Sequence, residues 1–116
     1  KLDLHKLYED IDFPIFNVIT AWDSAIDFEM TLGLSTHSKS NELKKSTLYY
    51  YYNPDDPNHQ APELPSKAIL FKAPKELKHA SVLLRNDRLL SEPEFNPYYD
   101  ELESAFTRFL MQNFPQ

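Results

Sequence analysis

The residues that could do acid–base or metal chemistry are concentrated in one short polar stretch. Asp55, Asp56 and His59 lie within Asp-Asp-Pro-Asn-His. Two carboxylates and an imidazole could hold a divalent cation or move a proton, which makes these residues the candidates for a small metal-assisted hydrolase. The same residue types also favour a solvated turn, and the stretch lacks the glycine of a calcium-binding loop. The sequence therefore predicts no metal and no cofactor here, with the hydrolase as the second alternative function.

Composition excludes several other chemistries. The chain has no cysteine, which rules out thiol catalysis, disulfides and cysteine-ligated zinc. It has one glycine, so glycine-rich phosphate-binding loops cannot be present. The serines do not lie in a glycine-flanked nucleophile elbow. We therefore expect a protein without enzymatic activity.

The most distinctive local feature is a run of tyrosines. Thr47–Tyr52 consists of β-branched, aromatic and leucine residues, which favours a strand, and Asn53–Asp56 supplies the turn residues and the proline that end it. Because side chains alternate along a strand, one pair of rings should enter the core and the other should face outward. Either Tyr50 and Tyr52 or Tyr49 and Tyr51 would then be available to a partner.

This surface, together with the aromatic content, favours a protein-binding function. The chain has 7 tyrosines, 8 phenylalanines and 1 tryptophan but few catalytic groups, and aromatic residues commonly anchor interfaces. We therefore predict a non-catalytic interaction domain (an adaptor, assembly or inhibitor module) that binds another protein, or a second copy of itself through the sheet. The predicted contact residues are Tyr50, Tyr52, Pro54, Tyr98 and Tyr99.

Binding of single-stranded nucleic acid is the first alternative. Tyrosine rings stack on bases, and lysines on the same sheet would contact phosphates. The net charge of −6 argues against this function, since it repels phosphate, although residues 39–88 are net basic between two net acidic ends. The residues of this alternative are Tyr50, Tyr52, Lys44, Lys45, Lys67 and Lys72.

Three segments are predicted to form the sheet that positions these residues. Ile26–Leu34 alternates apolar and polar residues, which is typical of a strand with one wet face. Residues 36–45 would join it to Thr47–Tyr52 as an antiparallel hairpin, and Lys67–Lys72 would add a third strand. The fold class that follows is α+β: a small antiparallel sheet of about three to four strands packed against a C-terminal helix and one or two further helices. The second face of the sheet is expected to be open.

The helices are predicted from caps and spacing. Asn96 and Pro97 are suited to begin a C-terminal helix whose face includes Tyr99, Leu102 and Phe106. A short helix is expected near residues 4–11. Residues 15–22 fit a helix or a strand, and we favour the helix. Residues 75–91 fit a helix to about residue 85, or a hairpin.

The chain is long enough for one domain, 1–116, with an exposed proline-rich loop at 53–66. It does not begin with Met, so we expect a piece of a longer protein. We find no apolar run long enough to span a membrane and no signal peptide, and we take the cytoplasm or nucleus as the default compartment.

Overall fold

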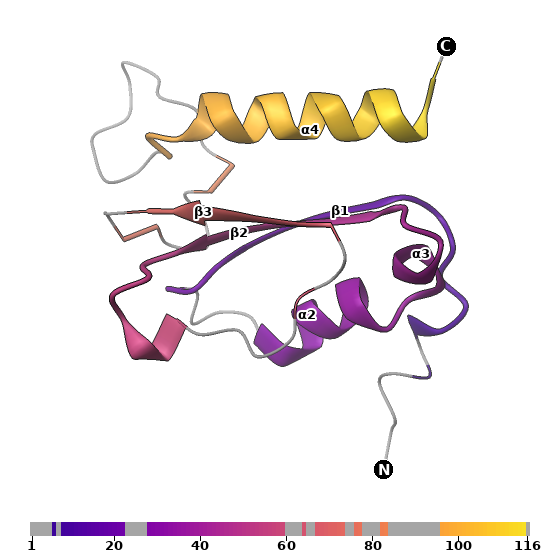
Figure 1. Cartoon of the computed structure of the whole chain (residues 1–116), viewed down its shortest axis with the longest axis horizontal. Helices are drawn as coiled ribbons and strands as arrows, with labels where there is room; N and C mark the ends of the chain where they lie inside the picture. The colour runs from indigo at the N-terminus through magenta and orange to yellow at the C-terminus, as the bar shows by residue number, and fades with distance from the viewer. Residues whose placement is uncertain are drawn as a thin grey trace.

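The computed structural model describes residues 6, 8–22, 28–59, 64, 67–73, 76–77, 82–83 and 96–115. Within them the chain forms a small sheet with helices on both of its sides (Figure 1). The elements, in chain order, are β1 (Ile15–Thr20), α2 (Phe28–Thr36), α3 (Lys39–Glu42), β2 (Ser46–Tyr52), the 3-10 turn η1 (Pro57–His59), β3 (Ala68–Lys72) and α4 (Tyr99–Asn113).

The sheet has the order β1-β2-β3, and both pairings are parallel. Ile15 lies opposite Ser46, and Leu48 lies opposite Ala68. The predicted antiparallel sheet is therefore wrong. The chain between β1 and β2 contains α2 and α3, and a crossover connection of this kind returns the chain to the same end of the sheet. The combination of a small sheet with a C-terminal helix is as predicted.

Two segments adopt the opposite structure from the predicted one. Residues 15–20 form a strand rather than a helix, in keeping with their β-branched and aromatic residues. Phe28–Thr36 forms a helix where a strand was predicted. Apolar residues that alternate also recur four positions apart, as Met30 and Leu34 do, and residues four apart share one face of a helix as well as of a strand. The Met, Glu and Leu residues of this segment are good helix formers.

A tight turn connects α3 to β2. The Ser38 side chain accepts a hydrogen bond from the Asn41 N–H at 3.1 Å and caps the start of α3. At the other end Lys44 has a φ of 61°, in the left-handed region that favours glycine. This conformation lets the Lys44 N–H donate to the Asn41 carbonyl and the Lys45 N–H donate to the Ser40 carbonyl. The chain thereby reverses directly into the central strand.

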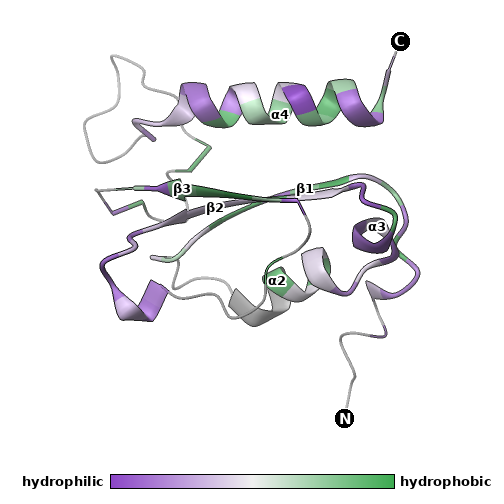
Figure 2. Ribbon diagram, in the orientation of Figure 1, coloured by the Kyte–Doolittle hydropathy of each residue, from purple (hydrophilic) through white to green (hydrophobic). Residues whose placement is uncertain are grey.

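Helices cover both faces of the sheet: α4 lies along one face and α2 along the other (Figure 1). Two buried clusters fill the space between these layers. The α4 side contains Tyr49, Tyr51, Ala73, Leu77, Val82, Leu102 and Ala105, and the α2 side contains Ile19, Leu32, Leu48 and Tyr50. In Figure 2, β3 and much of β1 are hydrophobic and the tyrosine-rich β2 is intermediate, whereas α4 alternates between hydrophilic and hydrophobic residues. The expectation of an open second face is wrong, since parallel sheets are generally covered on both faces.

The C-terminal helix is confirmed and runs from Tyr99 to Asn113. Its N-cap residue is Tyr98, while the Asn96 side chain accepts a hydrogen bond from the Tyr98 N–H just before the helix begins. In the proline-rich loop, Pro54 is exposed and η1 forms a short turn. Of the helix predicted near residues 4–11, the structure describes residues 6 and 8–11, and residues 6 and 8 are helical. The helix or hairpin predicted at 75–91 lies largely outside the described residues. In the part of the chain that the structure describes, no helix is long and apolar enough to cross a membrane.

Candidate functional site

The tyrosine run lies in the interior rather than on a surface. Tyr49, Tyr50 and Tyr51 are 2%, 3% and 0% exposed, and Tyr52 is half-buried. Tyr50 and Tyr52 stack on each other with ring centroids 5.5 Å apart on the α2 side. The prediction that one complete pair of rings would face outward is wrong, because β2 is the central strand and has a helical layer on each side.

Two of the buried hydroxyl groups connect the sheet to distant parts of the chain. The Tyr51 hydroxyl accepts a hydrogen bond from the Asn96 side chain at 2.8 Å, and the Tyr50 hydroxyl donates to the His59 carbonyl at 3.0 Å. Burial disfavours the ionised phenolate. It raises the pKa of Tyr49 and of Tyr50 to about 12 and raises the pKa of Tyr51 further. These phenols are neutral structural groups at ordinary pH.

The predicted protein-contact residues do not form one surface. Tyr50 and Tyr52 lie on the α2 side of the sheet, whereas Tyr98 and Tyr99 lie at the start of α4 on the other side. The ring of Tyr98 packs on Phe71 with the centroids 5.0 Å apart. Tyr99 lines the groove that is described below.

The residues of the nucleic-acid alternative are likewise divided. Lys45 directly precedes β2 and Lys67 directly precedes β3, whereas Tyr52 and Lys72 end these strands. At about 3.3 Å per residue, the length of β2 places Lys45 and Tyr52 roughly 23 Å apart. Lys44 is used in the turn that begins β2. Tyr52 and Lys72 lie opposite each other in the sheet. Tyr50 is buried, however, and the other three lysines precede β2 and β3, so this set does not form one stacking platform.

Asp55, Asp56 and His59, the candidate acid–base and metal-binding residues, lie in a hydrogen-bonded turn. His59 is 6% exposed, and its Nδ1 accepts a hydrogen bond from the Asn53 N–H at 2.9 Å. Its Nε2 lies 3.4 Å from an Asp56 carboxylate oxygen, and its ring packs edge-on against Trp22 at 4.7 Å. Asp55 is exposed. Because its Nδ1 already accepts this hydrogen bond, the His59 imidazole orients the loop. No group of three or more His, Asp or Glu among the described residues is placed to hold a metal ion.

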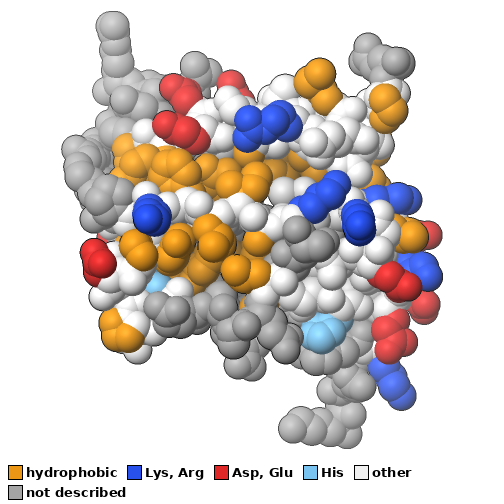
Figure 3. Space-filling model, viewed as in Figure 1, with side chains coloured by type: hydrophobic (Ala, Val, Ile, Leu, Met, Phe, Trp, Pro, Cys, Tyr) orange, Lys and Arg blue, Asp and Glu red, His pale blue; other side chains and the backbone are white. Residues whose placement is uncertain are grey.

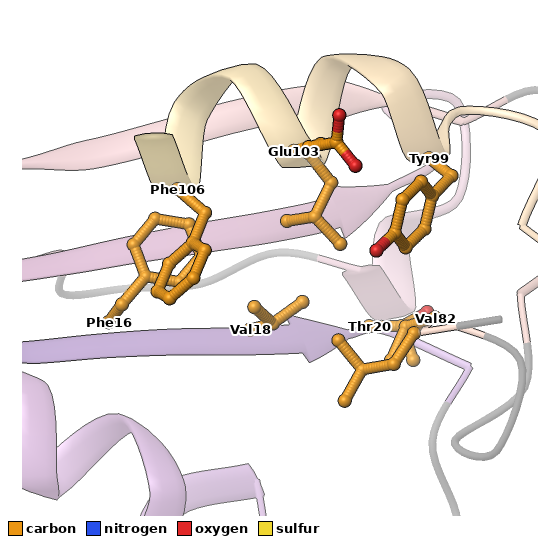
Figure 4. A pocket seen from close by; sticks show the side chains of 9 residues that line it. Phe16, Val18, Thr20, Val82, Tyr99, Glu103 and Phe106 are labelled. Carbon is orange, nitrogen blue, oxygen red and sulfur yellow. The ribbon is translucent and has the colours of Figure 1, made fainter. Parts of the chain in front are cut away.

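A groove with a volume of about 590 Å³ lies between α4 and β1 (Figure 4). We call it the α4–β1 groove. It is lined by Phe16, Val18, Thr20, Val82, Leu83, Tyr99, Leu102, Glu103 and Phe106.

The described residues that line the groove are mostly apolar, and Glu103 is the charged one among them. Phe16 and Val18 of β1 point toward α4, from which Tyr99 and Phe106 point back (Figure 4). The rings of Phe16 and Phe106 meet edge to face at a centroid distance of 5.2 Å. Even so, Phe106 remains 43% exposed. An apolar surface beside an acidic group is suited to bind a ligand that carries both apolar and basic groups.

The apolar surface continues along α4. Helix α4 buries Leu102, Ala105 and Phe109, which are spaced three and four residues apart. Phe106, Leu110 and Phe114 form a neighbouring row, spaced four apart, and are 43%, 40% and 56% exposed. A helix that buried only one apolar face would not need this second row.

Sequence reasoning missed this groove for two reasons. It assigned Phe106 to the buried face of the helix, and it favoured a helix at residues 15–22, which hid the alternation of Phe16, Val18 and Thr20. The second row of apolar residues on α4 was the available signal, because Phe106, Leu110 and Phe114 recur at four-residue spacing beside a complete core-facing row.

Comparison of the chain with protein-family models, with curated proteins and with solved structures finds no significant match.

Proposed function

We propose that this chain is a non-catalytic protein-binding domain and that the α4–β1 groove is its contact surface. The observation that carries the proposal is the exposed apolar row on α4 next to the groove. Phe106, Leu110 and Phe114 are each at least 40% exposed, on a helix that already has a complete buried face. Exposed apolar patches of this kind on small domains commonly mark interaction sites.

The charge around the groove supports a partner with basic residues. Glu103 lines the groove, and Asp100 and Glu101 lie in the first turn of α4. Acidic groups at the edge of an apolar surface attract partners that carry lysine or arginine around an apolar centre. On the face seen in Figure 3, separate Lys and Arg side chains lie over and beside two bands of hydrophobic side chains.

Site-specific crosslinking in the protein's own cells tests the proposal. A photoreactive amino acid replaces Phe106 in one version of the protein, and in the control it replaces Leu70, which is 45% exposed on β3. We expect the Phe106 position to yield one protein adduct that the Leu70 position does not, and we expect the crosslinked protein to bind the purified domain. Equal adducts from both positions, or none from Phe106, would contradict the proposal.

A further inference from the structure

The open edge of β1 suggests what kind of partner the groove takes. Among the described residues, β1 lies at one edge of the sheet and pairs with β2 alone. The Ile15 N–H donates to the Lys45 carbonyl, and the Ala21 N–H donates to the Tyr51 carbonyl, so the odd-numbered residues of β1 point their backbone groups toward β2. Because these directions alternate along a strand, the backbone groups of Phe16, Val18 and Thr20 point away from the sheet.

These three residues also line the α4–β1 groove with their side chains. Within the described residues, their N–H and C=O groups have no backbone partner. A chain lying beside β1 would therefore meet free hydrogen-bonding groups and an apolar groove at the same three positions. This is the arrangement used when an extended peptide adds a strand to a sheet, with backbone bonds for affinity and pockets for alternate side chains.

The two edges of the sheet differ in how they are protected. β3 ends in Lys72 and is preceded by Lys67, and lysines at an edge discourage pairing with other strands. The β1 sequence, Ile-Phe-Asn-Val-Ile-Thr, contains no charged residue and no proline. The edge beside the groove thus lacks the residues that usually block strand addition.

We infer that the α4–β1 groove binds an extended segment of another protein that alternates apolar and basic residues and pairs with the edge of β1. This inference rests on the proposed function and specifies its partner. The apolar side chains would enter the groove beneath α4. The basic side chains would lie near Glu103 and near Asp12, which precedes β1 and is exposed.

A second copy of the domain fits this edge less well. Pairing two β1 strands across a twofold axis would bring together two copies of the same acidic surroundings, and each chain carries a net charge of −6. Like charges placed opposite each other weaken association. We therefore commit to a basic partner and treat self-association as an outcome that would overturn the inference.

Backbone amide exchange, measured by NMR on the full 116-residue chain, tests the pairing directly. The probe is a capped ten-residue peptide that alternates valine and lysine. In the free domain we expect the amides of Asn17 and Ile19 to exchange slowly and those of Phe16 and Val18 to exchange rapidly. On addition of the peptide, the Phe16 and Val18 amides should become protected.

Two control peptides separate the parts of the inference. A valine–lysine peptide with N-methyl groups on the amides of one edge loses at least two backbone hydrogen bonds and should bind about tenfold more weakly or worse. A valine–glutamate peptide should also bind at least about tenfold more weakly at low salt, because it meets acidic groups.

Three results would overturn the inference: protection of the Phe16 and Val18 amides in the monomeric free domain, protection that appears only as the domain self-associates, or equal binding of all three peptides. The proposed function has a separate readout. If crosslinking from position 106 captures a partner while the β1 amides stay unprotected in the complex, the protein-binding function stands and the strand pairing does not.

Discussion

The hydrogen bond between Tyr51 and Asn96 provides a quantitative test of how α4 is attached to the sheet. The Tyr51 hydroxyl is the acceptor for the Asn96 Nδ2 group at 2.8 Å, and the two residues are 0% and 1% exposed. Tyr51→Phe keeps the ring in the core but leaves a buried N–H without this acceptor. The free energy of unfolding should fall by about 1–3 kcal/mol, as measured by urea denaturation.

Asn96 makes two further bonds, so its removal should cost more than removal of the hydroxyl. Its Nδ2 group also donates to the Val82 carbonyl at 2.9 Å, and its Oδ1 accepts from the Tyr98 N–H at 2.9 Å. Asn96→Ala should therefore destabilise the domain more than Tyr51→Phe does. In the double variant the two effects should not add, with a coupling of about 0.5–3 kcal/mol.

The matched control is Tyr52→Phe. Tyr52 is half-buried on the same strand, and within the described residues its hydroxyl has no hydrogen-bond partner. Its replacement should change the free energy of unfolding by less than about 0.5 kcal/mol. If Tyr51→Phe is equally mild and its effect adds to that of Asn96→Ala, the Tyr51 hydroxyl does not hold Asn96 in place.

Three more predictions follow from buried or strained positions. The pKa values of Tyr49 and Tyr50 are raised from 10.0 to about 12. Because the unfolded chain releases these protons first, the free energy of unfolding should keep its full value below pH 10 and decrease as the pH rises from 10 toward 12. Urea denaturation across this pH range, with phenolate absorbance, measures the decrease. Leu48→Ala should lower the free energy of unfolding by about 2–5 kcal/mol, since Leu48 is 0% exposed. The control Leu43→Ala, at a 46% exposed position, should change it by less than about 0.5 kcal/mol. Similar losses for both variants would place Leu48 outside the core. Lys44→Gly should raise the free energy of unfolding by roughly 0.5–1 kcal/mol, and with it the melting temperature, because Lys44 has a φ of 61°. A loss of stability would contradict the left-handed turn.

The sequence predicted β2 and α4 correctly because each has strong local signals. β2 consists largely of β-branched and aromatic residues followed by turn residues, and α4 starts after Asn-Pro with acidic residues in its first turn. In both segments local preference and tertiary context agree. Their boundaries could be read without knowledge of the neighbouring elements.

The topology could not be read in the same way, because it depended on two ambiguous segments. Assigning residues 26–34 to a strand left about ten residues before β2, too few for a crossover, and an antiparallel hairpin followed. With that segment as α2 and Ile15–Thr20 as β1, the connection becomes long enough for parallel pairing. These two misassigned segments together gave the sheet the wrong strand direction.

The candidate site followed from the same error. A sheet with one open face would expose alternate tyrosines, and the sequence offers no local sign that β2 has helices on both sides. Asn96 was predicted only as a helix cap, because its contact with Tyr51 joins residues far apart in the chain. The groove likewise depends on Phe16 and Phe106 meeting across the fold.

The most direct test of the central claim is the affinity of two variants for the protein that crosslinks at position 106. The first is Phe106→Asp, in the groove, and the second is Leu70→Asp, at a similarly exposed position on β3. If the α4–β1 groove is the contact surface, Phe106→Asp should weaken binding at least about tenfold while Leu70→Asp leaves it within about twofold. Equal affinities of the two variants would show that the partner binds elsewhere.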